Sequence, residues 1–286
     1  MTDSTWEDIK REAKLVSLPN VYFRLKEILD DPDFAMAEVA IAISQDPSIT
    51  LRLLRIVNSS LYGFANKIET VSRAVSMLGT QQVHDLVLAT SVAKAFKDMS
   101  SEIMDMHRFW RRSIYCAVAS RQLASLCGDC NKERVFVAGL LHDIGHLIMY
   151  QALPNLAEQA ILTAKENNQS LYLVERSLFG FDYAWAGSKL MREWSIPESL
   201  CEITMHHVEP AKAEKVQLET AVIHLGSLLA KADDGEGVFN EGSLTVDTVS
   251  WDITKISPED CTSLVEQIEE ETLEVLNLFF PQGQAA

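Results

Sequence analysis

Residues 138–147 read AGLLHDIGHL, an apolar run with helical spacing that carries two histidines and an aspartate. On a continuous helix His142 and His146 share one face, and Asp143 lies about 100° further round the same turn. Gly139 and Gly145 each cost a helix interior about 1 kcal/mol relative to alanine, which indicates that a neighbouring backbone comes close. An adjacent histidine and aspartate can bind one cation of a hydrolytic metal site, or can form a hydrogen-bonded polar pair inside an all-helical core.

The composition indicates a globular chain with an acidic surface. Apolar residues make up 47% of the 286 residues, enough for a sizeable core, and the formal net charge is -16. Such a charge repels nucleic acid and anionic membranes, so we expect neither as a partner. No apolar run reaches the roughly 18 residues of a membrane span, and the N-terminus does not resemble a signal peptide. The five cysteines are an odd, sparse set that favours a cytoplasmic location, and the lone CxxC at 127–130 gives little support for a zinc or redox site.

Helical periodicity continues along the chain, and no stretch alternates polar and apolar residues as a strand would. Asp46-Pro47 and Ser257-Pro258 each place a capping side chain before a proline at the first helical position. The predicted helices cover residues 15–29, 35–44, 47–58, 71–78, 80–96, 107–126, 133–152, 154–167, 171–178, 182–194, 197–207, 218–232 and 257–279. The pattern loosens around 98–105, and 233–248 is typical of a loop. We therefore predict an all-α protein with an N-terminal helical lobe, residues 1–100, and a second lobe with the C-terminal helix, residues 101–286.

Short motifs in both predicted lobes resemble those of HDOD domains. In the first lobe they are Leu18-Pro19, Asp46-Pro47, Leu53-Leu54, Asn58-Ser59, Tyr62-Gly63, Ala74 and Leu78-Gly79. In the second they are FWRRS at 109–113, GLLHDIG at 139–145, GFD at 180–182, WSIP at 194–197 and HH at 206–207. Their order and spacing carry the resemblance from about residue 15 to about residue 232. It implies a multi-helical fold whose second lobe is related to the HD metal-dependent phosphohydrolases, and a regulatory role in bacterial signalling that is mostly non-enzymatic.

The same resemblance shows where this chain departs from the catalytic pattern. An active HD phosphohydrolase holds its ion with an early histidine, the His-Asp pair and a late aspartate, and the binuclear HD-GYP cyclic-dinucleotide phosphodiesterases add further histidines. The positions that still match ligands are His142, Asp143, His206 and His207. The positions where a ligand is expected but another residue stands are Arg112, Tyr183 and Ser227. We expect the four matching residues to converge although the two pairs are far apart in sequence.

Arg112 is the departure with the clearest chemical consequence, because arginine is a permanent cation that offers only hydrogen-bond donors. It would repel the ion that a histidine binds, and it could form an ion pair with Asp143 instead. Three interpretations stay open: a self-satisfied polar cluster, a weak site for Fe, Mn, Ni or Zn, and an anion or nucleotide site. If the alignment is shifted by one residue, Arg111 takes this role. His146 is expected to support the ligands from behind.

Other polar residues are less convincing as ligands. His107 lies about 140° round the predicted helix from Arg112, so we expect it at the surface. Asp233-Asp234 follows the expected late aspartate by nearly two turns and is interpreted as a solvated helix end.

Two classes of function remain. The favoured one is a non-catalytic HDOD regulatory or scaffold protein that contacts signalling proteins on separate chains, binds no cofactor and could form a homodimer. The alternative is a metal-dependent phosphohydrolase or cyclic-dinucleotide phosphodiesterase with an altered ligand set.

Overall fold

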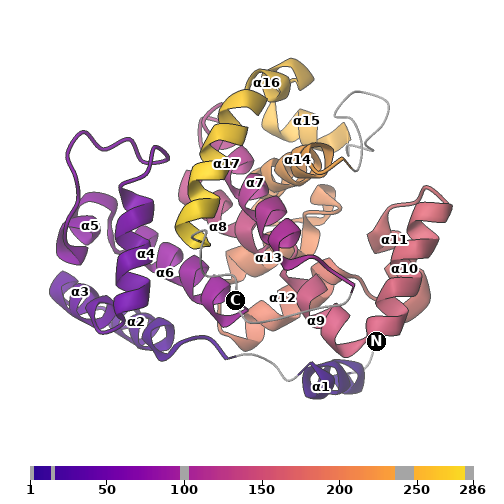
Figure 1. Ribbon diagram of the computed structural model, residues 1–286, viewed down its shortest axis with the longest axis horizontal. Coiled ribbons are helices and arrows are strands. Elements are labelled where there is room, and N and C mark those ends of the chain that lie inside the picture. The colour runs from indigo at the N-terminus through magenta and orange to yellow at the C-terminus, as the bar shows by residue number, and fades with distance from the viewer. Residues whose placement is uncertain (1–2, 14–16, 97–102, 236–247, 281–286) are drawn as a thin grey trace. The chain divides into compact units, whose positions relative to one another are not determined.

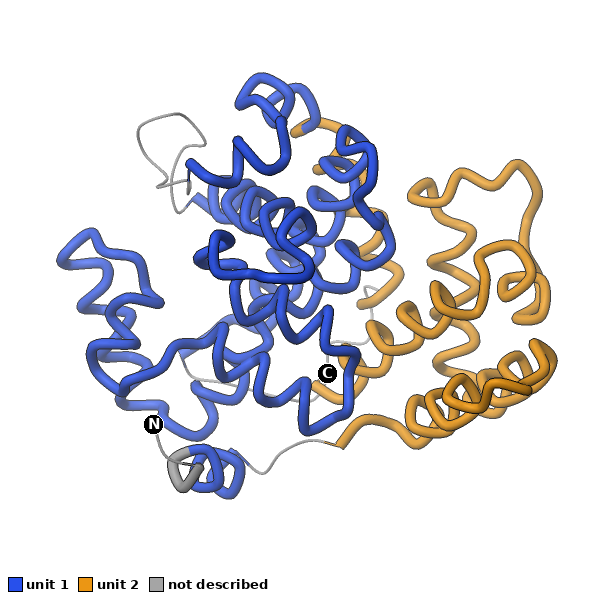
Figure 2. The backbone as a smooth tube through the Cα atoms, turned by 180° about the vertical axis from the view of Figure 1, so that it is seen from behind, with its two compact units in different colours: residues 1–16, 99–264 blue, residues 17–98, 265–286 orange. Residues whose placement is uncertain are grey.

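The computed structural model describes residues 3–13, 17–96, 103–235 and 248–280, and within these ranges every regular element is a helix (Figure 1). The all-α prediction is therefore confirmed. The chain forms two compact units (Figure 2). The larger unit comprises residues 1–16 and 99–264, and the smaller unit comprises residues 17–98 and 265–286.

The terminal segments belong to different units from those that the division into residues 1–100 and 101–286 assigns to them. Helix α1 (Asp3–Glu12) was not predicted, and it packs in the larger unit because Trp6 is buried edge-on against Trp185 at a centroid distance of 5.7 Å. Helix α17 (Val265–Phe279) packs against α4 (Pro47–Val57) in the smaller unit, where Glu274 accepts a hydrogen bond from the Ser60 hydroxyl. Contacts between residues far apart in the sequence thus decide where each end packs.

The smaller unit includes a helix start that the sequence predicts, capped by Asp46. Its remaining helices are α2 (Asn20–Asp30), α3 (Met36–Ser44), α5 (Val71–Leu78) and α6 (Thr80–Ala95). Asp46 caps α4 by accepting hydrogen bonds from the backbone amides of Ser48 and Ile49, at 3.0 and 3.1 Å. The helix predicted from residue 15 begins only at Asn20, because Pro19 has an extended backbone (φ -57°, ψ 143°) that stops the helix on its N-terminal side.

The larger unit contains the predicted site. Its remaining elements are α7 (Met106–Ala124), α8 (Lys132–Leu141), α9 (Ile144–Ala152), α10 (Pro154–Glu166), α11 (Leu171–Phe179), α12 (Tyr183–Glu193), α13 (Glu198–His206), a 3-10 turn (Pro210–Lys212), α14 (Gln217–Asp233), α15 (Thr248–Thr254) and α16 (Pro258–Ser263). Helix α7 packs directly on α8 and α14. Its backbone comes so close to α8 that a Cβ on Gly139 would stand 2.6 Å from the Ala117 Cα. The close approach of the two backbones explains why residue 139 is a glycine, as the sequence indicated.

The prediction of one continuous helix over 133–152 is wrong in a way that matters for the site. Helix α8 ends at Leu141 and α9 begins at Ile144, so His142 and Asp143 lie in the turn between them. The stretch Lys132–Ala152 is long and apolar enough to cross a membrane, but 89% of that window is buried inside the protein. It is therefore read as a core segment. The predicted helix over 257–279 is likewise two helices, α16 and α17, and most of the loop predicted over 233–248 lies outside the described residues.

Candidate functional site

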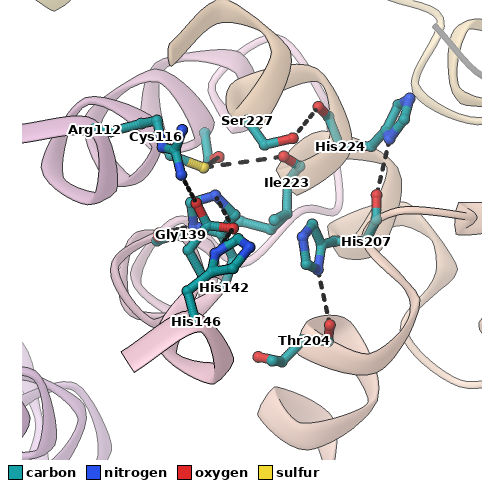
Figure 3. Close-up of polar contacts among 12 residues, drawn as sticks. Arg112, Cys116, Gly139, His142, His146, Thr204, His207, Ile223, His224 and Ser227 are labelled. Carbon is teal, nitrogen blue, oxygen red and sulfur yellow. Dashed lines mark hydrogen bonds and ion pairs between the residues drawn. The ribbon is translucent and has the colours of Figure 1, made fainter. Parts of the chain in front are cut away.

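Three of the predicted ligands meet inside the larger unit. One donor atom from each of His142, Asp143 and His207 lies within 4.8 Å of the others, a grouping that could hold a metal ion. The rings of His142 and His207 approach edge to face with their centroids 5.2 Å apart (Figure 3). Each of the three residues is only 1% exposed. The turn after α8 and the end of α13 bring them together.

Both histidines are held by backbone carbonyls. The Nδ1 atom of His142 lies 2.6 Å from the carbonyl oxygen of Gly139, and the Nδ1 atom of His207 lies 2.8 Å from that of Thr204 (Figure 3). Because a carbonyl only accepts, each Nδ1 must carry the proton, and each Nε2 presents a lone pair. The Nε2 atom of His207 has no hydrogen-bond partner among the described residues. This is the arrangement found for histidines that bind metals.

The protonation states also suit a ligand set. Burial lowers the pKa of His142 and lowers that of His207 well below its usual range, so both rings are neutral near pH 7. Burial alone would raise the pKa of Asp143, but attraction to His142 and Arg112 outweighs it and holds the pKa well below its ordinary value. Because the His142 ring is neutral near pH 7, the positive charge in contact with Asp143 is Arg112, and Lys231 adds a weaker attraction. The cluster therefore presents two neutral imidazoles and one carboxylate.

Arg112 forms the ion pair with Asp143 that its sequence position suggested. Its Nη2 atom donates to Asp143 Oδ2 at 3.0 Å, and the Arg112 side chain is 17% exposed. The other carboxylate oxygen, Oδ1, lies 3.4 Å from His142 Nε2 and has no hydrogen-bond partner in the described part of the chain. One oxygen of Asp143 is thus committed to a protein cation, while the other faces the histidines.

Two further buried residues, His146 and Glu175, extend the cluster, and Glu175 was not predicted. The Nδ1 atom of His146 lies 3.8 Å from Asp143 Oδ1, and its Nε2 atom lies 3.8 Å from Glu175 Oε1. Burial lowers the pKa of His146 to about 3 and raises the pKa of Glu175 to about 8. Neither ring nitrogen of His146 has a hydrogen-bond partner among the residues described. His146 thus lies behind Asp143 without a hydrogen bond to it, and the carboxylic acid of Glu175 lies beyond.

The sequence did contain a signal for Glu175. It lies four residues after Leu171 and one after the buried Val174, so it shares the inward face of α11. A glutamate on such a face is rarely fully buried without a partner. Its Oε2 atom accepts a hydrogen bond from the backbone amide of Tyr183 at 2.9 Å, which fixes the start of α12.

The remaining predicted positions do not contribute donors to the group. His206 is half-buried at the last residue of α13, and among the described residues the group of possible metal ligands includes His207 but not His206. His207 follows the last residue of α13, and its ring is the one that contacts the His142 ring. Tyr183 stacks on the His146 ring at a centroid distance of 3.9 Å. The Ser227 hydroxyl donates to the carbonyl of His224 at 2.9 Å (Figure 3).

The interpretation of Asp233-Asp234 as a solvated helix end is wrong. Arg111 forms an ion pair with Asp233, whose side chain is only 10% exposed, and Arg108 Nε lies 2.7 Å from Asp234 Oδ2. These pairs join the start of α7 to the end of α14. They also show that Arg112, rather than Arg111, is the arginine at the cluster. His107 is exposed, as expected.

The donor chemistry fits one divalent ion and no more among the described residues. His142, Asp143 and His207 would hold it through Nε2, Oδ1 and Nε2, a neutral-imidazole and carboxylate set that suits several divalent metals. Such an ion would supply Lewis acidity to a bound oxygen. For the binuclear pattern, Tyr183 and His206 do not supply the further ligands.

We expect Glu175→Gln to reduce the pH dependence of stability. The native pKa of about 8 exceeds the ordinary value of 4.5, so the native state keeps a proton that the unfolded chain releases. The contribution of Glu175 to stability is then fullest below pH 4.5 and falls by a few kcal/mol as the pH rises towards 8, since one pKa unit is about 1.4 kcal/mol. Glutamine keeps the oxygen that accepts from Tyr183 but cannot ionise. Urea unfolding measures the free energy of unfolding at pH 5 and pH 8.5, and the variant should become more stable relative to wild type at the higher pH. Glu158→Gln, at an exposed position, is the control. If the stabilities of Glu175→Gln and wild type changed equally with pH, the raised pKa of Glu175 would be contradicted.

Comparison with known proteins agrees with this architecture. A model of the HDOD domain family matches residues 15–210. Among solved structures, an HDOD domain protein of unknown function from Geobacter sulfurreducens is 24% identical, with a TM-score of 0.75 and coverage of 97% of this chain and 99% of that one. A proposed phosphohydrolase from Shewanella amazonensis SB2B is 22% identical, with a TM-score of 0.73 and coverage of 95% and 98%. A proposed signal transduction protein from Marinobacter aquaeolei VT8 is 20% identical, with a TM-score of 0.70 and coverage of 97% and 65%.

At these identities the structural matches show the fold alone. The chain also matches an uncharacterized protein of Treponema pallidum (strain Nichols), with 21% identity over 226 residues, and spans only 44% of that protein's length. The family model covers more than half of the chain and includes the turn that carries His142 and Asp143. The chain therefore belongs to the HDOD domain family.

Proposed function

We propose that this HDOD protein is a non-catalytic regulatory protein of bacterial signal transduction that acts through contacts with other proteins. The observation that carries the proposal is the bond between Arg112 and the carboxylate of Asp143, at 3.0 Å. A divalent ion bound to Asp143 would lie close to the guanidinium. Two unit charges of like sign 4 Å apart repel by about 4 kcal/mol at an effective dielectric constant of 20, and a divalent ion roughly doubles this.

Burial of the cluster supports the same conclusion. A catalytic metal keeps one coordination position open for water or substrate. His142, Asp143 and His207 are each 1% exposed, which leaves these side chains no surface for a phosphodiester. The Arg112 bond gives Asp143 a cation from the protein itself, so charge neutrality does not require a metal ion. The HD-like lobe then serves as a rigid scaffold.

One observation favours the alternative, a metal-dependent phosphohydrolase or cyclic-dinucleotide phosphodiesterase. The three donor groups are already in the protonation states of ligands, and both histidines are oriented through Nδ1. The name of the Shewanella neighbour as a proposed phosphohydrolase agrees with this reading, and that of the Marinobacter neighbour agrees with a signalling role.

The two functions differ in an assay of the purified protein. After chelation and reloading with manganese, magnesium or iron, we expect wild type to hydrolyse bis(p-nitrophenyl) phosphate no faster than His142→Ala. Turnover by wild type that is lost in His142→Ala would overturn the regulatory proposal in favour of the enzyme.

Restoring the absent ligands should increase metal affinity. We expect Arg112→His combined with Ser227→Asp to bind manganese at least about tenfold more tightly than wild type, because removing a buried like charge exceeds the 1.4 kcal/mol of a tenfold change. Calorimetric titration measures the affinity. Arg111→His, which removes a neighbouring arginine that pairs with Asp233, is the control and should leave manganese affinity unchanged. Equal affinity of the double variant and wild type would show that Arg112 does not oppose the ion.

The partners in this proposal are signalling proteins on separate chains, and the compartment is the cytoplasm. A homodimer is a further option. The acidic chain, with a formal net charge of -16, favours partners with basic surfaces.

A further inference from the structure

We propose that the groove between α2 and α3 of the smaller unit is the docking site for a basic amphipathic helix of a partner protein. The inference rests on the proposed role in protein contacts and assigns that role to a surface. The groove has a volume of about 450 Å³. Its lining residues are Arg24, Glu27, Ile28, Asp31, Glu38 and Ile41.

The two helices present matching faces to this groove. On α2 the lining residues Arg24, Glu27 and Ile28 follow the spacing i, i+3 and i+4 and therefore share one face, and Asp31 follows the last residue of the helix. On α3, Glu38 and Ile41 are three residues apart and share a face in the same way. The helices pack side by side (Figure 1). Arg24 donates to the Gln45 side chain at 2.6 Å, just after the C-terminal end of α3.

The groove contains an apolar side chain that the described part of the chain leaves more than half exposed. Ile41 is 58% exposed, the highest value among the large apolar side chains of the described residues. Ile28, which also lines the groove, is half-buried. Together they offer an apolar contact for one or two aliphatic side chains. Burying such a side chain is worth about 1.5–3 kcal/mol, which gives a partner a reason to dock here.

The charges of the lining residues indicate the charge that a partner should carry. The lining contains three carboxylates, those of Glu27, Asp31 and Glu38, and one guanidinium, that of Arg24, which donates to Gln45. Asp31 and Glu38 each also accept a hydrogen bond from a backbone amide. An apolar contact with an acidic rim is complementary to a segment that carries lysine or arginine beside its apolar residues. A second copy of this chain is disfavoured, because its formal net charge of -16 would meet an acidic rim.

A helix is the form of partner that the geometry favours. A groove between two packed helices accepts a third helix whose apolar residues recur at i, i+3, i+4 and i+7, with charged residues on either side. The third helix would lay its apolar stripe over Ile41 and Ile28 and place its basic residues beside Asp31, Glu38 and Glu27.

The test uses three fluorescent synthetic peptides of about 15 residues, a length at which isolated helices become marginally stable. The first has leucines at helical spacing in a lysine-rich background. The second replaces each lysine with glutamate, and the third replaces each leucine with serine. Fluorescence anisotropy with the full chain should show that the first peptide binds about tenfold or more tightly than either of the others.

Variants locate the binding. Ile41→Ser should weaken binding of the leucine–lysine peptide about tenfold, whereas Leu51→Ser, which removes a 51% exposed leucine from α4 of the same unit, should not. Glu27→Gln combined with Asp31→Asn should also weaken it, whereas Glu269→Gln with Glu270→Gln on the exposed face of α17 should not. The inference is overturned if wild type binds none of the peptides, if the glutamate peptide binds as well as the lysine peptide, or if Ile41→Ser binds like wild type. Those outcomes leave the regulatory proposal standing, because the phosphodiester assay tests it in the other unit.

Discussion

Gly145→Val should leave the larger unit without a cooperative native fold. Gly145 lies in α9 where that helix crosses α12, and a Cβ there would stand 2.6 Å from the backbone nitrogen of Gly187 and overlap the carbonyl of Tyr183. Both contacts are with backbone, so no side-chain rotation can relieve them. Overpacking a core ordinarily costs about 1–3 kcal/mol, and a clash of two helix backbones should exceed that range. Urea unfolding followed by circular dichroism measures the loss.

Gly128→Val is the control for this substitution. A Cβ at Gly128 would meet no atom within 4 Å, and the backbone there is not left-handed, so stability should change by less than about 0.5 kcal/mol. The same experiment bears on the site, because separation of α9 from α12 would also separate His146 from Tyr183, which now stack at 3.9 Å. A Gly145→Val protein with wild-type stability would show that the two helices can move apart at little cost.

Helical periodicity and cap residues were enough to predict the class of the fold and most of its elements. Asp46 accepts from two amides of the first turn of α4, and Thr70 accepts from the amide of Arg73, as such residues do at helix starts. The break between Leu141 and Ile144 was not predictable in this way, because residues 138–147 are apolar at helical spacing on both sides of it. Periodicity indicates which residues face the core. Because the turn between these two buried helices also faces the core, periodicity does not distinguish it from a helix.

The sequence predicted the kinds of side chain at the site, but only some of the residues that form it. The order of motifs identified His142, Asp143 and His207, and the charge of arginine indicated the pair between Arg112 and Asp143. Whether His206 or His207 faces the cluster depends on the rotation of α13, which only its packing fixes. The ion pairs of Asp233 and Asp234 depend on how α14 crosses α7, and no local pattern encodes that crossing. Local sequence therefore gives residue types and faces, whereas tertiary packing selects which neighbours meet.

Arg112→Ala should destabilise the larger unit by up to about 3–5 kcal/mol, the cost of removing one partner from a fully buried ion pair, because Asp143 is buried while Arg112 is 17% exposed. Asp143 is 1% exposed, and burial opposes its charge, so without the guanidinium its carboxylate is left with neutral histidines as neighbours and only the weaker attraction of Lys231. Manganese should then restore part of the loss, because a divalent ion can replace the arginine charge beside His142 and His207. At a metal concentration 100 times the dissociation constant, the gain is about 2.7 kcal/mol. Thermal unfolding with manganese and with a chelator measures both effects.

Arg111→Ala separates this effect from the general loss of an arginine. Arg111 precedes Arg112 on α7 and pairs with Asp233, so its removal should also cost stability, but manganese should not restore it. Wild type should gain little from manganese, since Arg112 already supplies the cation that Asp143 requires. If manganese stabilised wild type as much as Arg112→Ala, the arginine would not be standing in for a metal ion. The cluster would then be a metal site with an arginine beside it, and the case for an enzyme would strengthen accordingly.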